Sequence, residues 1–126
     1  LEKAYRKNPG QLKYALGFSQ VLFELTEFQK VKDALAPFAS GDQGLDQVYY
    51  LLGKSCFGLG QYAEAVPYFK DYLTRFGANL EVLNLLGLTY YKLGDNAEAL
   101  AAWRKSLELN PNQEDIKKLV DSLTKK

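Results

Sequence analysis

The stretch at residues 52–73, LGKSCFGLGQYAEAVPYFKDYL, returns in altered form at residues 86–107 as LGLTYYKLGDNAEALAAWRKSL. The interval is 34 residues, and five residue pairs of the same kind keep it: Gly53 and Gly87, Gly60 and Gly94, Ala65 and Ala99, Phe69 and Trp103, and Leu73 and Leu107. Pro9 and Pro111 lie three such intervals apart. A period of this length is typical of stacked helical repeats, so we predict an all-α solenoid of antiparallel helix pairs.

The unit at residues 80–113 shows the helix pair most clearly. A first helix is expected at residues 80–93, because apolar side chains recur there at helical spacing: Leu83, Leu86, Tyr90 and Leu93. Gly94 suits the left-handed conformation that ends a helix. A second helix is expected at residues 96–109, with Ala99, Leu100, Trp103 and Leu107 on its inner face. Pro111 ends it, since the residue before a proline is pushed out of helical geometry.

The unit at residues 46–79 repeats this design. Its inner residues are expected to be Tyr49, Leu52 and Cys56 on the first helix and Ala65, Phe69, Tyr72 and Leu73 on the second. The turn lies at Gly60, and Pro67 is expected near the start of the second helix, where the loss of one backbone donor is tolerable.

The unit at residues 12–45 is degenerate. Ser19 stands where the other two units have glycine, and the turn at Thr26 and Glu27 has no glycine. Pro37 is expected to cut the second helix short, and residues 40–44 are expected to form a loop. The inner positions are assigned to Ala15, Phe18, Leu22, Phe28 and Leu35.

The two ends of the chain differ in kind. Residues 114–126 predict one amphipathic helix that caps the stack, with an apolar side of Ile116, Leu119, Val120 and Leu123.

Residues 1–9 match the end of a preceding repeat, and the chain looks like a piece of a longer protein. An earlier helix would cover the inner face of Leu1 to Tyr5, and in its absence a second copy could do so, which gives a homodimer. The compartment cannot be read from the sequence.

These residues resemble the tetratricopeptide repeat family. The match runs through Leu52, Gly53, Cys56, Gly60, Tyr62, Ala65, Phe69 and Leu73, then Leu86, Gly87, Tyr90, Gly94, Ala99, Trp103, Leu107 and Pro111. Cys56 stands where tyrosine is usual, and Gly77 where proline is usual. The resemblance implies that residues 1–126 form a single domain, a right-handed superhelix of three repeats, a preceding half-repeat and a capping helix.

The resemblance also implies that the first helices of successive units line a concave groove that holds a partner peptide. Helical spacing then places nine residues in this groove: Leu16, Gln20, Phe23, Tyr50, Lys54, Phe57, Asn84, Leu88 and Tyr91. The best-known pattern in the family grips a terminal carboxylate and needs basic or amide groups at positions 16, 20, 51, 81 and 85. Of these only Gln20 is suitable, so the chain does not carry that clamp.

Three leucines in these first helices, Leu51, Leu85 and Leu88, leave two interpretations open. They either fill the contact between neighbouring units or form an apolar strip that a helix or extended peptide covers.

The sequence offers little for catalysis, metals or nucleic acid. It has no histidine and one cysteine, so the commonest general base and a zinc site are both missing. Cys56 is expected to be a small core residue. The net charge of +1 gives no argument for a nucleic-acid partner, and no apolar run is long enough for membrane insertion. We therefore expect no enzyme activity, no catalytic or metal residues and no cofactor.

These observations favour a non-enzymatic scaffold that binds a protein or peptide partner in the groove. Two alternatives stay open. The chain could be a self-association module of a larger multi-repeat protein, or the regulatory arm of an enzyme whose catalytic part lies elsewhere.

Overall fold

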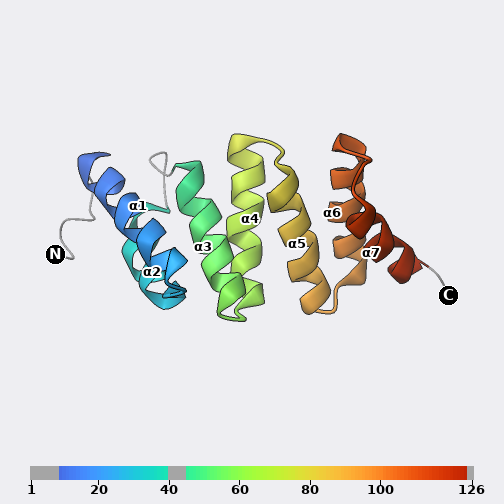
Figure 1. The fold of residues 1–126 in the computed structure, drawn as a ribbon, viewed down its shortest axis with the longest axis horizontal. Coiled ribbons are helices and arrows are strands. Elements are labelled where there is room, and N and C mark those ends of the chain that lie inside the picture. The colour runs from blue at the N-terminus through green and yellow to red at the C-terminus, as the bar shows by residue number, and fades with distance from the viewer. Residues whose placement is uncertain (1–8, 40–44, 125–126) are drawn as a thin grey trace.

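The computed structural model describes residues 9–39 and 45–124, and within these ranges every regular element is a helix. The elements are α1 (Pro9–Glu24), α2 (Phe28–Leu35), a short 3₁₀ helix η2 (Ala36–Phe38), α3 (Asp46–Gly58), α4 (Tyr62–Phe76), α5 (Leu80–Lys92), α6 (Asn96–Leu109) and α7 (Glu114–Thr124). Figure 1 shows them side by side in one row from the N-terminal to the C-terminal end. The all-α solenoid predicted from the 34-residue period is confirmed.

The core is divided along this row into three clusters. The first joins α1, α2, η2 and α3, the second joins α3, α4 and α5, and the third joins α5, α6 and α7. Successive helices contact one another, and α1 also reaches α3. Each cluster draws on more than one unit, because a single pair of short helices cannot bury its apolar faces alone.

In each of two units, a glycine on the first helix faces an aromatic ring on the second. A Cβ on Gly53 would lie 2.5 Å from the ring of Phe69, and a Cβ on Gly87 would collide with the indole Nε1 of Trp103. Both rings are fully buried. The indole also donates a hydrogen bond of 3.3 Å to the backbone oxygen of Asn84. Glycine is therefore needed at these two positions for the ring to reach the backbone of the neighbouring helix.

The first unit replaces this contact with a different pair. Ser19 lies 34 residues before Gly53 and takes the place of the glycine. Leu35 lies 34 residues before Phe69 and takes the place of the ring. Both residues are fully buried. A leucine is smaller than a phenylalanine and leaves room for the Cβ and hydroxyl of Ser19, which explains how a degenerate unit still closes.

The helix ends follow the local sequence. Gly60 and Gly94 have φ values of +75° and +82°, and Thr26 adopts a φ of 59° in the turn that lacks glycine. The helix α2 ends at Leu35 and continues as η2, as expected from Pro37. The apolar side of α7, which carries Ile116, Leu119, Val120 and Leu123, packs on the cluster that contains Trp103.

Two local predictions were wrong. Phe18 was expected to face inward but is 42% exposed. It lies on the next stripe of α1, where its ring stacks with that of Tyr14 at 6.5 Å. Pro67 is not near the start of α4 but inside it, and the helix continues through it to Phe76. The predicted loop at residues 40–44 and the face of Leu1 to Tyr5 lie outside the described residues.

The close contact between glycine and indole predicts opposite effects for two identical substitutions. Gly87→Ala should lower the free energy of unfolding by about 1–3 kcal/mol, because the new methyl group overpacks against Trp103. Gly17→Ala should raise it by up to about 1 kcal/mol, since no atom lies within 4 Å of the new Cβ and alanine is the better helix former. Urea denaturation of the two variants measures both changes in the free energy of unfolding. Equal changes would show that Gly87 is not tightly packed against Trp103.

Candidate functional site

The sequence placed its nine candidate groove residues on α1, α3 and α5, and we call the face that carries them the first-helix surface. On each helix the three candidates follow a spacing of four and then three residues, which keeps them on one side. The structure brings three of the nine into mutual contact: Phe23 from α1, and Tyr50 and Lys54 from α3.

Lys54 is the centre of this contact. Its Nζ lies 5.2 Å from the centre of the Phe23 ring and 4.7 Å from the centre of the Tyr50 ring. It also lies 3.2 Å from a carboxylate oxygen of Glu81 on α5 and donates a 3.0 Å hydrogen bond to the hydroxyl oxygen of Tyr50. The Tyr50 hydroxyl in turn donates to the same Glu81 carboxylate at 2.8 Å. One ammonium group therefore joins α1, α3 and α5 across two unit boundaries.

Glu81 belongs to this cluster although the sequence did not assign it to the groove. It lies one turn before Asn84 on α5, and this spacing of three residues puts both side chains on the same side of the helix. That spacing was the available signal. With Glu81 beside it, the charge of Lys54 is already balanced within the protein.

The environment shifts two pKa values in the cluster. Burial works against the charged form of Lys54, but its hydrogen bonds to Tyr50 and Glu81 outweigh this effect and raise the pKa of the ammonium above its ordinary value. Burial is also the main reason why the pKa of the Tyr50 hydroxyl is raised, and the Glu81 carboxylate adds to this effect. At neutral pH the cluster therefore holds a charged lysine and a neutral phenol.

Four of the other candidates contact residues outside this cluster. Asn84 donates a 2.9 Å hydrogen bond to Gln113, and its own Oδ1 is buried without a hydrogen-bond partner among the described residues. The Phe57 ring packs edge-on against the ring of Tyr62, with 5.2 Å between their centres. The centre of the Tyr91 ring lies 6.1 Å from that of Trp103. Leu88 is half-buried against the third core cluster.

Two candidates differ sharply in exposure. Leu16 is only 6% exposed and belongs to the first core cluster, so its side chain offers almost no surface. Gln20 is exposed. The burial of Leu51 in the first cluster, and the packing of Leu85 on the second, favour the interpretation in which the leucines fill contacts between units.

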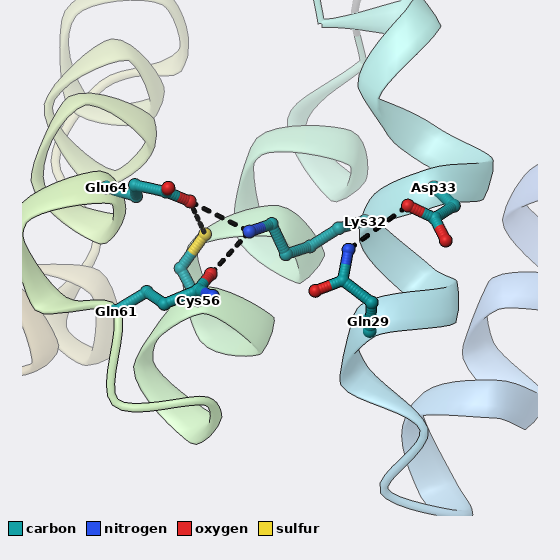
Figure 2. Close-up of polar contacts among 6 residues, drawn as sticks. All are labelled: Gln29, Lys32, Asp33, Cys56, Gln61 and Glu64. Carbon is teal, nitrogen blue, oxygen red and sulfur yellow. Dashed lines mark hydrogen bonds and ion pairs between the residues drawn. The ribbon is translucent and has the colours of Figure 1, made fainter.

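A second polar cluster joins α2 to α4 (Figure 2). Lys32 Nζ lies 2.8 Å from a carboxylate oxygen of Glu64 and donates a hydrogen bond to the side-chain oxygen of Gln61. Cys56 lies beside them with its sulfur 3.9 Å from the same Glu64 oxygen. Burial raises the pKa of the Cys56 thiol, which keeps it protonated and weakly nucleophilic. The arrangement is that of a contact between neighbouring units, with the cysteine as a buried core residue.

None of the described helices is long and apolar enough to cross a membrane. In residues 9–39 and 45–124, no three histidine, cysteine, aspartate or glutamate side chains come together in a way that could hold a metal ion.

Comparison with known proteins adds the family and a structural relative. Models of the tetratricopeptide repeat match residues 46–77 and 80–113, together more than half of the chain. The fold is similar to the crystal structure of PcrH in complex with the chaperone binding region of PopB. The TM-score is 0.75 and the identity 13%, over 93% of this chain and 94% of that chain. No curated protein sequence matches the chain.

The contacts of Lys54 predict a dependence of stability on pH. Lys54→Met should lower the free energy of unfolding by about 0.2–1 kcal/mol at neutral pH, the range of a partly exposed ion pair. Because folding raises the pKa of this lysine above its ordinary value of 10.5, the stabilisation is present below 10.5 and is lost as pH rises through the higher folded value. Urea denaturation on both sides of this range, with Lys118→Met on the exposed side of α7 as control, checks it. A difference that persists in strong alkali would contradict the assignment.

Proposed function

The chain belongs to the tetratricopeptide repeat family, and we propose that it is a non-enzymatic scaffold that binds a partner peptide or helix on its first-helix surface. The observation that carries the proposal is the cluster of Phe23, Tyr50, Lys54 and Glu81. It sets aromatic rings and polar groups from three successive first helices next to one another.

The cluster supports binding because it is held in place before a partner arrives. Each of its polar groups already has a partner inside the protein, so the side chains lose little conformational freedom when a ligand binds. The rings of Phe23 and Tyr50 stay half-exposed, and Tyr91 is 44% exposed. Partly exposed aromatic side chains on a rigid base are the kind of residue that contributes most to protein interfaces.

The structural relative supports the same kind of partner. The PcrH structure contains the chaperone binding region of PopB bound to a protein of similar fold. A fold of this kind can therefore hold a segment of another protein. For the present chain we propose a partner segment of the same class, a peptide or helix, without carrying over its identity.

The proposed absence of enzyme activity has two supports in the chain itself. It contains no histidine, and its single thiol, on Cys56, is fully buried and has a raised pKa. The commonest general base and the strongest common nucleophile are therefore not offered to a substrate.

The binding surface is tested by a double substitution on it. Tyr50→Ala with Tyr91→Ala should weaken capture of partner proteins from native extract by at least about ten-fold, because two aromatic anchors are removed. The measurement is quantitative mass spectrometry of proteins captured on the immobilised chain, with equal folding shown by circular dichroism.

The matched control is Leu59→Ala with Leu109→Ala, two exposed apolar residues at the turns that lie outside the first-helix surface. Partners that are lost equally from both variants, or retained by both, would show that the first-helix surface is not the binding surface.

A second candidate function, self-association, is favoured by the outer side of α1. Val21 on α1 and Leu25, the residue after its end, lie four residues apart and are 55% and 64% exposed. An apolar stripe of this kind is typical of a contact with another helix. We propose that a second copy packs on this stripe in a homodimer.

The homodimer is tested by light scattering coupled to size exclusion. The unchanged chain should elute with twice the mass of one chain, and Val21→Lys with Leu25→Lys should convert it to a monomer, because two charges then lie in the apolar contact. A monomeric mass for the unchanged chain, or a dimer that survives both lysines, would contradict this proposal and leave the peptide-binding proposal intact.

A further inference from the structure

A groove of about 250 Å³ lies between α4 and α6, on the second helices rather than the first. Its apolar lining comes from all three of the helices that surround it. Leu73 from α4 and Tyr90 from α5 are partly exposed there, Ala101 from α6 is exposed, and Leu83, Leu86 and Ala102 are buried. The α5 residues of this lining lie on a different side of the helix from Asn84, Leu88 and Tyr91, because the two sets are offset by one or two residues at about 100° per residue. We call this feature the α4/α6 groove.

Long side chains occupy the neighbouring gap between α2 and α4, which we call the filled gap. There Lys32 reaches from α2 to Glu64 and Gln61 on α4 (Figure 2). Tyr68 fills the space beside it, since its ring packs against both the first and the second core clusters. One interval later Val66 stands in the position of Lys32, and Ala102 in that of Tyr68. Two long side chains are thus replaced by short ones, and the groove is the space that they leave.

The charges around the α4/α6 groove also differ from those of the filled gap. Glu98 occupies the position of Glu64, but the lysine that pairs with Glu64 has become Val66. Lys70 and Lys105 line the groove as well. Across the described part of the chain, no ion pair involves Lys70, Glu98 or Lys105. The groove therefore carries two unpaired positive charges against one negative charge.

We propose that the α4/α6 groove is a second binding surface, for a peptide segment in which bulky apolar side chains are flanked by carboxylates. The apolar side chains would lie on Leu73, Tyr90 and Ala101, the lining residues that are open to solvent, where they replace water on apolar surface. The carboxylates would lie toward Lys70 and Lys105, which opposite charge favours. Because this surface is separate from the first-helix surface, the chain can bind two segments at once.

The test uses two synthetic peptides of the same length. One carries Asp-Phe-Leu-Glu between Gly-Ser pairs, and the other carries Lys-Phe-Leu-Lys in the same frame. Each is titrated into the ¹⁵N-labelled chain, and amide chemical shifts are followed by NMR. The acidic peptide should shift amides around Lys70, Thr74, Ala101 and Lys105, and it should bind at least about five-fold more tightly than the basic one.

Two variants separate the apolar and the charged parts of the recognition. Ala102→Tyr restores the residue found in the filled gap and should abolish the shifts. Lys70→Glu with Lys105→Glu should reverse the preference between the two peptides. Lys13→Glu with Lys118→Glu changes the net charge equally at exposed positions outside the groove and should leave the preference unchanged.

The outcomes decide the proposal in each direction. Equal binding of both peptides, shifts that map to the first-helix surface, or a preference unaffected by reversal of Lys70 and Lys105 would overturn it. If Ala102→Tyr does not fold, the charge reversal decides alone. The variant with Tyr50→Ala and Tyr91→Ala should still bind the acidic peptide, so failure of the first-helix surface and failure of the α4/α6 groove can be told apart.

Discussion

The solenoid depends on the contact of an aromatic ring with the bare backbone of a neighbouring helix. Trp103 lies against Gly87 and Phe69 lies against Gly53, with no space for a Cβ at either glycine. This contact sets how closely the two helices of a unit approach, and close approach lets short helices exclude water from a thin core. The cores then connect from unit to unit, because each cluster is completed by residues of the next pair.

Stacking of the helix pairs produces two surfaces, one on the first helices and one on the second helices. The side chains at the junctions between units differ between these two surfaces. On the first helices, Lys54 joins Phe23, Tyr50 and Glu81 across two junctions. On the second helices, Lys32 and Tyr68 occupy one junction, and the shorter Val66 and Ala102 stand in their positions at the next, where the α4/α6 groove lies.

How far the sequence could predict the candidate site depended on the range of the contacts. Helical spacing placed Phe23, Tyr50 and Lys54 on one side of their helices, and the structure brings them together. It could not show that Leu16 is buried or that Glu81 neutralises Lys54, because both facts depend on how far one unit is rotated against the next. Phe18 was misplaced for a related reason. Apolar residues on two adjacent stripes of α1 look alike until the packing partner of each stripe is known.

The sequence by itself determined the helical class and the pairing of helices. These depend on periodicity and on steric rules that act over a few residues or one repeat. The tertiary structure alone decided which charges pair across units and where a groove remains. These depend on distances between side chains about thirty residues apart, such as Lys32 and Glu64, and such distances exist only after the units have packed.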